Sequence, residues 1–391
     1  MSILFISKSI INPMHGGVER VTSIIASFLR KNDISSYYLS LTNNEEYRDE
    51  FQYVLPDPQN YCSESNILFV KELIHERSIK IIINQGGLSP YTSKFSYILK
   101  SLDVKIISVV HSSLLGAIYS FPYTYAKTIN SLKLSWLLPI LKTQFIKGVV
   151  LKLYKHKYRH HYFELCTKSD IVVLLSKEYV KELNFFIQPH VANNIVNIGN
   201  PCSFHINKYQ TKKNNTILYV GRIDIYQKQV DLLLYIWDRI CRIRPNWKLQ
   251  IIGDGPDMGY LKKIYSELSL INVEFLGFCE PQNYYINSSI LCMTSAFEGF
   301  PMVLPEAMYY GCVPIVFESF SSIKEIIDHG KNGLLVSPFD IEEYVNKLLL
   351  IMDNKELRDN MAAEALRKSK EFSISNIGSK WQDLITYVSQ L

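Results

Sequence analysis

The feature that most constrains the fold of this chain is a regular alternation along its whole length. Short apolar runs rich in β-branched and aromatic residues are each followed by a longer helical or polar stretch. Runs that are apolar on both faces are typical of parallel strands covered by helices on both sides, so the alternation predicts α/β layers. Twelve strands are expected, at residues 3–7, 35–41, 79–84, 104–110, 170–176, 194–199, 216–221, 248–253, 273–277, 290–295, 313–317 and 333–336.

The length of the chain predicts two domains. A domain usually contains about 100–200 residues, and this chain has 391 residues, of which 47% are hydrophobic and 20% charged. A polar stretch with little periodicity, residues 202–215, is expected to connect the domains. We expect two Rossmann-like, doubly wound domains facing across a cleft, over residues 1–205 and 206–372. A separate amphipathic helix over residues 373–391 is expected to pack back on the first domain.

Cysteine usage and the distribution of apolar residues argue against several classes of protein. The seven cysteines form no C-x-x-C pair and no Cys/His spacing of a zinc site, which favours a reducing compartment. No stretch of about 18 apolar residues runs uninterrupted. The N-terminus lacks the basic region and the cleavage site of a signal peptide. We therefore expect a cytoplasmic protein without a spanning helix or a structural zinc site.

Positive charge is concentrated in residues 123–168, which contain nine Lys or Arg and one acidic residue, Glu164. That segment carries +8, and the rest of the chain carries −3. The lysines alternate with Trp, Leu, Ile and Phe, as in a helix that lies on an anionic bilayer surface. A helix pair with a solvated basic face is the other interpretation, and both stay open. Nucleic-acid binding is disfavoured, because no RNA- or DNA-binding module accompanies the charge.

Two glutamates stand eight positions apart in residues 298–306, EGFPMVLPE. Glu298 follows an apolar strand, and Glu306 lies in the first turns of a helix for which Gly311 is a plausible stop. Backbone N–H groups at a helix start favour an anion. A diphosphate there would leave Glu306 to accept hydrogen bonds from ribose hydroxyls and Glu298 to face the group beyond the phosphates. The alternative is an ordinary helix-entry loop with a favourably placed glutamate.

A second signal follows the expected strand 216–221 in the same domain. That strand ends in Gly221, Arg222 comes next, and Lys228 precedes a helix. Two cations at the carboxyl end of a strand suit a phosphate group, Arg as a planar fork and Lys as a point charge. An ordinary surface Arg and Lys would be the preferred interpretation for an isolated pair, but the nearby glutamate loop favours a binding role.

The stretch IIGDGPDMG, residues 251–259, resembles a dinucleotide-binding fingerprint but has the wrong glycine spacing. An aspartate inside the turn would also repel a pyrophosphate. We interpret the stretch as a tight strand-to-helix turn at the rim of the pocket, and hydride transfer is disfavoured.

The first half carries weaker signals. Gly16 and Gly17 follow the first strand and open a helix, where the backbone could approach a ligand. His111 ends the strand 104–110, and either a ligand contact or an ordinary loop histidine fits it. Asn84 and Gln85 follow another strand and could hydrogen-bond hydroxyl groups.

These residues together resemble the retaining glycosyltransferases of family 4 (glycosyl transferases group 1), which have the GT-B fold. The resemblance is strongest over residues 216–340, where YVGRIDIYQK, IIGDGP, VEFLGF, EGFPMVLPEAMYYG and IIDHGKNGLLV follow the order and spacing of the family. In the first half only GGVER, His111 and SDIVVLLS match. Uneven matching is expected, since the second domain of the family binds the donor and the first binds a variable acceptor.

The resemblance implies a role for each matching residue. Arg222 and Lys228 would clamp the donor diphosphate, Glu298 would lie near the donor sugar, Glu306 would bind the ribose, and His111 would contact the sugar. Glu298, His111, Arg222 and Lys228 form the implied catalytic set. The implied donor-binding set is Gly17, Gly221, Arg222, Lys228, Gly277, Phe278, Glu298, Gly299, Phe300, Pro301, Met302, Val303 and Glu306.

The sequence departs from the family pattern after the clamp lysine, where Gln229 replaces the usual glycine. The loop from Arg222 to Lys228 is also one residue longer than in many members.

The implied activity is transfer of a hexose or N-acetylhexosamine, with retention, from a nucleotide-diphosphate sugar. The flanking sequence favours UDP over GDP donors. The acceptor would be a saccharide, such as a lipid-linked oligosaccharide of bacterial surface polysaccharide synthesis at the inner face of the membrane. No cofactor and no metal are expected, because the chain contains no D-x-D triplet. The alternative from another class is a non-catalytic GT-B subunit that scaffolds a synthase.

Overall fold

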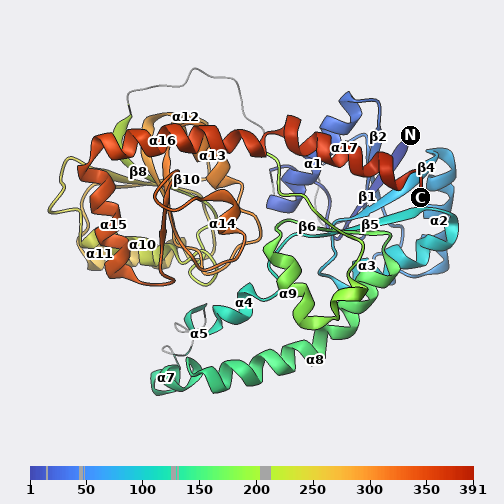
Figure 1. Cartoon of the computed structure of the whole chain (residues 1–391), viewed down its shortest axis with the longest axis horizontal. Helices are drawn as coiled ribbons and strands as arrows, with labels where there is room; N and C mark the ends of the chain where they lie inside the picture. Colours follow the sequence, from blue (N-terminus) through green and yellow to red (C-terminus); the bar gives the residue numbers. More distant parts are fainter. Residues whose placement is uncertain (15, 44–46, 48, 125–128, 130–131, 203–212) are drawn as a thin grey trace. The chain divides into compact units, whose positions relative to one another are not determined.

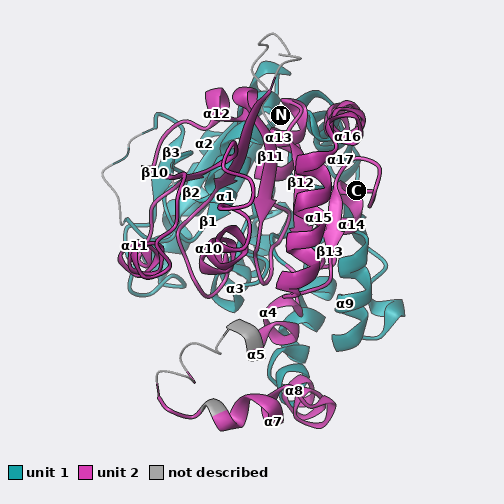
Figure 2. Ribbon diagram, turned by 90° about the vertical axis from the view of Figure 1, so that its left-hand side faces the viewer, with its two compact units in different colours: residues 1–112, 153–203, 372–391 teal, residues 113–152, 204–371 magenta. Residues whose placement is uncertain are grey.

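The computed structural model describes the chain except for residues 15, 44–46, 48, 125–128, 130–131 and 203–212 (Figure 1). The described residues form two compact units (Figure 2). Unit 1 comprises Met1–Ser112, Leu153–Ser203 and Phe372–Leu391, and unit 2 comprises Ser113–Lys152 and Phe204–Glu371. The expected boundary between 205 and 206 and most of the expected connector lie outside the described residues, as does Lys127 of the basic segment.

Unit 1 contains a seven-stranded sheet in which every neighbouring pair is parallel, in the order β3-β2-β1-β4-β5-β6-β7. The strand order reverses between β1 and β4, which is the arrangement of a doubly wound sheet. The strands are β1 (Ser2–Ser7), β2 (Ser35–Ser40), β3 (Gln52–Val54), β4 (Ile79–Asn84), β5 (Lys105–Val110), β6 (Ile171–Leu174) and β7 (Ile195–Asn197). The main helices are α1 (Gly17–Lys31), α2 (Glu64–Glu76), α3 (Pro90–Leu99), α9 (Glu178–Phe186) and α17 (Ile374–Val388).

Helix α17 closes unit 1 by packing on α1. Gly378 lies against the ring of Phe28, so closely that a β-carbon on Gly378 would come within 2.5 Å of a ring carbon. The residues that precede α17 are also held in place, because the Cys202 N–H donates to the carbonyl of Phe372 at 2.8 Å. The amphipathic helix expected at the end of the chain is therefore present, and its apolar face is buried in unit 1.

Unit 2 contains a six-stranded, wholly parallel sheet in the order β10-β9-β8-β11-β12-β13. Here the strand order reverses between β8 and β11. The strands are β8 (Asn214–Val220), β9 (Lys248–Ile252), β10 (Val273–Gly277), β11 (Ser288–Met293), β12 (Val313–Phe317) and β13 (Leu334–Val336). The main helices are α10 (Val230–Asp238), α11 (Met258–Glu267), α12 (Gln282–Asn287), α13 (Val303–Tyr309), α14 (Ile323–Ile326), α15 (Ile341–Asp353) and α16 (Lys355–Ser369).

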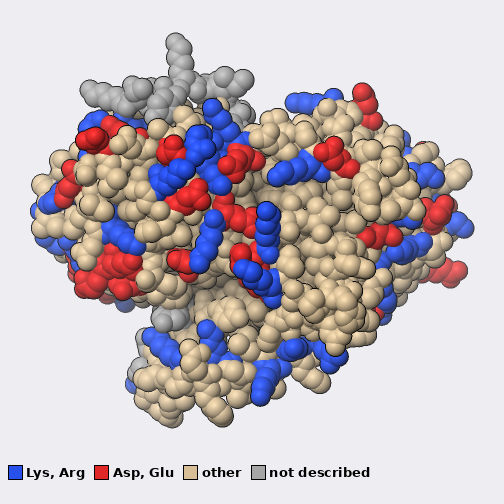
Figure 3. All heavy atoms as spheres, viewed as in Figure 1, with Lys and Arg blue, Asp and Glu red and all other residues tan. Residues whose placement is uncertain are grey.

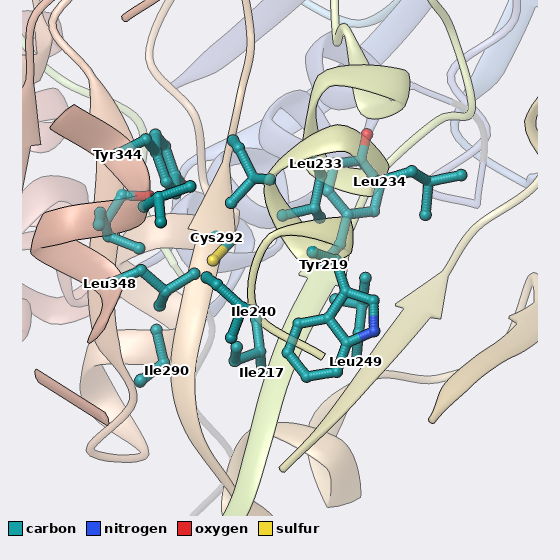
Figure 4. Close-up of a cluster of buried hydrophobic side chains, with 14 of the residues drawn as sticks. Ile217, Tyr219, Leu233, Leu234, Ile240, Leu249, Ile290, Cys292, Tyr344 and Leu348 are labelled. Carbon is teal, nitrogen blue, oxygen red and sulfur yellow. The ribbon is translucent and has the colours of Figure 1, made fainter. Parts of the chain in front are cut away.

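The core of unit 2 joins side chains of the sheet to those of α10, α15 and their neighbours (Figure 4). Ile217 and Tyr219 of β8, Leu249 of β9 and Ile290 of β11 meet Leu233 of α10 in one buried cluster. Strands buried on both faces explain why the strand sequences read as continuous apolar runs.

A third group of helices lies in the basic segment and directly before it. It comprises α4 (Gly116–Tyr119), α5 (Phe121–Thr124), α7 (Leu138–Leu141) and α8 (Gln144–Lys168). Residues 113–152 belong to unit 2, so α8 begins in unit 2 and continues from Leu153 in unit 1.

The prediction of doubly wound α/β domains is confirmed. Each of the twelve expected strands coincides with an observed strand to within two residues at either end. The sheet of unit 1 also contains β3, a strand that was not predicted from the sequence. It is a three-residue edge strand of half-buried residues, so it has no continuous apolar run.

Candidate functional site

The candidate site in unit 2 lies where the strand order reverses. β8 and β11 are parallel neighbours, so the loops that follow them, residues 221–229 and 294–302, leave the same edge of the sheet. In doubly wound sheets ligands bind at this edge and at this reversal. Hydrogen bonds to backbone carbonyls join the two loops. The Ala296 N–H donates to the carbonyl of Gln227 at 2.7 Å, and the Thr294 hydroxyl is within 3.1 Å of the carbonyls of Lys228 and Gln229.

Lys228 and Glu298 form an ion pair at this reversal. The ammonium Nζ of Lys228 donates to Oε1 of Glu298 at 2.6 Å. Only 8% of the Glu298 side chain and 22% of the Lys228 side chain are exposed. Partial burial weakens solvent screening, so each charge holds the other in place more firmly than a surface pair would. Two residues singled out separately from the sequence are therefore in direct contact.

Arg222 is held by a residue that the sequence analysis did not select, Asp224. The Arg222 guanidinium donates to Oδ2 of Asp224 at 2.7 Å and to Oε1 of Gln227 at 3.4 Å. The other oxygen of Asp224 accepts the backbone N–H groups of Tyr226 and Gln227 at 2.8 and 2.7 Å. The carboxylate thus fixes the loop and the guanidinium together, while 57% of the Arg222 side chain stays exposed. An aspartate two residues after a candidate arginine was the available signal.

The side chain of Tyr219 is hydrogen-bonded to the backbone of the same loop. Its hydroxyl donates to the carbonyl of Arg222 at 3.0 Å, and its side chain is buried. Burial raises the pKa of Tyr219 well above its ordinary value, and the nearby carboxylates of Glu298 and Asp224 raise it further. The hydroxyl therefore stays protonated and remains a donor to the loop.

Glu306 lies in the first turn of α13, as expected, and Gly311 beyond the helix has a φ of 76°. The Tyr285 hydroxyl of α12 donates to Oε2 of Glu306 at 3.2 Å, and both residues are buried. The Tyr285 ring is stacked on Tyr310, with centroids 6.1 Å apart. Tyr285 was not selected from the sequence, because nothing in its local pattern distinguishes it from other aromatic residues.

The remaining residues predicted to bind the donor lie at or after the ends of β8, β10 and β11. Phe300 and Pro301 are buried, Met302 and Val303 are half-buried, and the carbonyl of Gly299 accepts from the Ser322 hydroxyl. Gly277 has a φ of 67°, and the Phe278 that follows is 69% exposed. Gly221 directly follows β8 and donates its N–H to the carbonyl of Ile252.

The glycines of the turn 251–259 serve close contact between backbones. A β-carbon on Gly253 would lie 1.9 Å from the carbonyl oxygen of Gly221, and one on Gly255 would lie 2.3 Å from that of Ile223. This turn therefore packs directly against the loop that carries Arg222.

In unit 1, His111 follows β5 and contacts Gln85, which follows β4. Nε2 of His111 lies 2.5 Å from Oε1 of Gln85, and burial lowers the pKa of His111 to about 4. Gly17 begins α1, and a β-carbon on it would meet no atom within 4 Å. Gly16 before it has a φ of 72°, so the conformational need for glycine falls on Gly16.

Within the described parts of the chain, no group of three or more His, Cys, Asp or Glu side chains is arranged to hold a metal ion. None of the described helices is both long and apolar enough to span a bilayer.

Comparison with known proteins identifies the domain that carries this site. Residues 203–368 match the family model of glycosyl transferases group 1. An uncharacterized glycosyltransferase of Haemophilus influenzae is 27% identical over 384 residues, which cover 95% of this chain and 96% of that protein.

A second relative from Campylobacter jejuni matches a shorter stretch. It is named an α-1,4-N-acetyl-D-galactosaminyltransferase acting on a PP-undecaprenol-linked glycan, and it is 31% identical over 193 residues. That match covers 48% of this chain and 54% of the relative.

Solved glycosyltransferase structures share the fold over nearly the whole chain. Anabaena HepE in complex with UDP has a TM-score of 0.71 at 17% identity, covering 99% of this chain and 100% of that one. The galactosyltransferase WaaB of the lipopolysaccharide outer core has a TM-score of 0.69 at 20% identity, covering 100% of both chains. Residues 203–368 are therefore similar to the glycosyl transferases group 1 family, and the two parallel sheets of the chain have the GT-B fold of these glycosyltransferase structures.

Proposed function

We propose that this protein is a retaining, metal-independent glycosyltransferase that moves a hexosyl or N-acetylhexosaminyl group from a UDP-sugar to a saccharide acceptor. The observation that carries the proposal is the Lys228–Glu298 ion pair at the reversal of the sheet in unit 2. Arg222 lies in the same loop as Lys228, and Glu306 lies on the helix that follows Glu298. The complexes of HepE with UDP and with UDP-glucose support a uridine nucleotide as the donor.

The proposed chemistry assigns the charges of the site to the leaving group and to the sugar. As the bond from the anomeric carbon to the phosphate oxygen breaks, negative charge grows on the diphosphate, and Arg222 and Lys228 stabilise it. Positive charge grows at the anomeric carbon, and the carboxylate of Glu298 stabilises that. The acceptor hydroxyl attacks from the face that the diphosphate leaves, and its proton passes to the leaving phosphate oxygen. Configuration is thereby retained without a protein nucleophile.

The donor site is tested by thermal unfolding in EDTA with UDP, GDP, ADP or CMP. A ligand that binds only the folded protein raises the melting temperature. UDP should raise it selectively for the wild type and not for Glu306→Gln, which keeps the volume and the contact to Tyr285 but loses the charge. No stabilisation of the wild type by any nucleotide would favour the non-catalytic scaffold instead.

A measurement of turnover distinguishes an active enzyme from a non-catalytic scaffold. The wild type should hydrolyse its UDP-sugar slowly in the absence of an acceptor, with EDTA present, and the released sugar should first appear as the retained anomer. Proton NMR of the anomeric position follows this directly. An inverted product would contradict the retaining mechanism, and a requirement for added metal would contradict metal independence.

We further propose that the acceptor is lipid-linked and that helices α7 and α8 lie against an anionic bilayer. The name of the Campylobacter relative supports a lipid-linked acceptor. On α8, Phe145, Val149 and Leu153 are spaced four residues apart and therefore lie on one face of the helix. All three are exposed, Phe145 by 77%. In Figure 3 the segment labelled α7 and α8 in Figure 1 carries blue and tan spheres.

Four of the lysines of α8 and the loop before it form two sets of two. Lys142 and Lys152 are exposed beside the apolar face. Lys147 and Lys155 are half-buried, because their ammonium groups lie over the rings of Tyr119 and Phe185, at 4.5 and 5.0 Å. The first set is therefore the more exposed to solvent, and we propose that it contributes more to binding lipid phosphates.

This division supplies a matched control. A juxtamembrane lysine contributes about 1 kcal/mol to binding at an anionic surface. Lys142→Gln with Lys152→Gln should therefore lower the partition onto phosphatidylglycerol-containing vesicles about tenfold or more, as measured by sedimentation. The double variant Lys147→Gln with Lys155→Gln has the same charge and should bind nearly as the wild type does. Equal losses in both variants, or equal binding to phosphatidylcholine vesicles, would contradict this surface.

A further inference from the structure

Lys213 lies directly before β8 in unit 2, and its ammonium group contacts the ends of two helices. Nζ of Lys213 donates to the carbonyl of Tyr285, in the last turn of α12, at 2.8 Å. It also donates to the carbonyl of Tyr310, the residue that follows α13. Carbonyl groups at the end of a helix have no partner within that helix, so a lysine that reaches two of them joins the two helix ends.

The thiol of Cys312 reaches one of these carbonyls from the chain that follows α13. Its Sγ lies 3.1 Å from the carbonyl oxygens of Tyr285 and Ser288. Burial raises the pKa of Cys312, so the thiol keeps its proton and remains a donor. Two side chains, those of Lys213 and Cys312, therefore tie the end of α12 to the end of α13.

The side chains of the two tyrosines held in this way lead to Glu306. The Tyr285 ring is stacked on that of Tyr310, with an angle of 11° between the ring planes. The Tyr285 hydroxyl donates to Oε2 of Glu306, which lies on α13. Because Lys213 holds the backbone of both tyrosines, it fixes the position from which the Tyr285 hydroxyl reaches the carboxylate of Glu306.

The charge of Lys213 is not explained by an ion pair. Among the described residues, no carboxylate is paired with its ammonium group, and burial lowers its pKa. Taking an ammonium group out of water costs free energy that carbonyl groups return only in part, so an apolar side chain of the same length would give a protein of similar stability. Stability alone therefore does not account for a lysine here, which favours a role in the geometry of α12 and α13.

We infer that Lys213 is a positioning residue for the ribose of the nucleotide, because it holds the Tyr285 hydroxyl against the carboxylate of Glu306. A carboxylate that is already oriented binds ribose hydroxyls without the entropy cost of ordering its side chain. Lys213 acts through Tyr285 and not by its own contact with the ligand. The inference rests on the proposed function in taking Glu306 to bind the ribose hydroxyls.

The role is tested by calorimetric titration of the whole chain with UDP and with 2′,3′-dideoxy-UDP, which lacks both ribose hydroxyls. Lys213→Met keeps an unbranched side chain and removes the N–H donors. It should lower the affinity for UDP about fivefold, the usual effect of one weakened hydrogen bond, and leave the affinity for dideoxy-UDP unchanged. Lys262→Met, at an exposed position of α11, is the matched control and should bind both nucleotides as the wild type does.

Two results of this titration would overturn the inference. An unchanged affinity of Lys213→Met for UDP would show that the clamp does not affect the ribose. Equal losses of affinity for UDP and dideoxy-UDP would show general damage to the site and no selective effect on the ribose.

A double variant tests whether Lys213 acts through Tyr285. Residues that act through one another have non-additive effects. Lys213→Met should therefore lower UDP affinity less when it is added to Tyr285→Phe than when it is made in the wild type. Fully additive losses would overturn the inference.

Hydrogen exchange of the ligand-free protein, followed by mass spectrometry, tests the clamp without any nucleotide. Backbone amides of residues 282–287 and 303–311 should exchange faster in Lys213→Met than in the wild type, whereas those of α15 should not change. Unchanged exchange in both stretches would overturn the inference. Failure of the wild type to bind UDP would instead overturn the proposed function, and the exchange experiment would still decide whether Lys213 holds the two helices together.

Discussion

The two sheets share one architecture and differ in the chemistry of their carboxyl edges. Both are parallel, and in both the strand order reverses after the first strand of the unit, between β1 and β4 and between β8 and β11. The edge of unit 2 carries charged groups, among them the Lys228–Glu298 pair and Arg222. The edge of unit 1 carries the neutral, polar side chains of Gln85 and His111.

This difference teaches that the fold supplies a place for a ligand, and that the loop residues decide its charge. A site for a diphosphate needs cations that are already oriented, as Asp224 orients Arg222. A site for hydroxyl groups needs donors and acceptors without net charge, because a buried charge would cost more desolvation than a hydroxyl returns.

The largest effect is expected from breaking the ion pair in unit 2. Lys228→Ala removes a cation from the leaving diphosphate and leaves the carboxylate of Glu298 buried without its ammonium partner. We expect kcat/KM to fall about 100-fold or more, which is typical for the loss of one group that stabilises the transition state. Steady-state kinetics with a UDP-sugar measure it.

The stability of the same variant separates charge burial from catalysis. Lys228→Ala should lower the free energy of unfolding by roughly 1–3 kcal/mol, and adding Glu298→Gln should restore part of that loss without restoring activity. Arg244→Ala is the control, because its 2.6 Å pair with Asp353 is much more exposed. Equal losses of unfolding free energy in Arg244→Ala and Lys228→Ala would contradict the idea that burial makes the Lys228 pair contribute more to stability.

The neutral edge of unit 1 predicts a specific response to acid. The pKa of His111 is about 4 in the folded chain and about 6.5 in an unfolded one. Below pH 6.5 the unfolded state therefore binds a proton that the folded state does not, and the folded state loses stability as the pH falls from 6.5 towards 4. His111→Asn should remove roughly 2–3 kcal/mol of this acid-induced loss over that window.

Urea unfolding at pH 7, 6 and 5 measures this slope. His190→Asn, at an exposed histidine of unit 1, should keep the slope of the wild type. An identical slope in His111→Asn and the wild type would show that the ring of His111 is not kept neutral by the fold.

A smaller effect is expected where Tyr285 supports Glu306. Tyr285→Phe removes only the hydroxyl that donates to Oε2 of Glu306. Loss of one such bond costs about 1 kcal/mol, so UDP affinity should fall about fivefold while the melting temperature of the ligand-free protein changes little. Isothermal titration calorimetry measures the affinity. Tyr265→Phe, on α11 of the same unit, is the matched control and should bind UDP as the wild type does.

The smallest effect is expected at Gln229, where the family usually has glycine. Its φ of 48° lies in the left-handed region that favours glycine. Gln229→Gly should relieve this strain, but glycine also loses more conformational entropy on folding than glutamine does. The two effects oppose each other, so the free energy of unfolding should change by less than about 1 kcal/mol. Gln229→Val should be clearly less stable, because a β-branched residue tolerates this conformation poorly. Equal thermal stability of the Gly and Val variants would contradict the assignment of strain.

The fold could be predicted because its strands are buried on both faces. Such strands leave continuous apolar runs in the sequence, and only the edge strand β3, which is short and half-buried, left none. The order of strands within each sheet was beyond this pattern. The proximity of Lys228 and Glu298, 70 positions apart, depends on that order, because β8 and β11 are neighbours in space while two strands separate them in sequence.

The residues of the site that the sequence did not predict act through other residues. Asp224 orients Arg222, and Tyr285 contacts Glu306 from a different helix. Asp224 lies in the loop between the two candidate cations, whereas Tyr285 lies in no motif that points to chemistry. The sequence also could not separate the lysines of the basic segment, because the cation–π contact of Lys147 depends on a ring 28 positions away, that of Tyr119.

The division of unit 1 into three stretches of chain has a consequence for synthesis on the ribosome. Its last stretch, residues 372–391, follows all of unit 2 in the sequence. The apolar face of α1 that α17 covers therefore stays open until unit 2 has been translated, and a nascent chain halted within α16 exposes it. Unit 2 can thus complete its core before unit 1 does, and during that interval the open face of α1 is apolar surface that favours aggregation of the nascent chain.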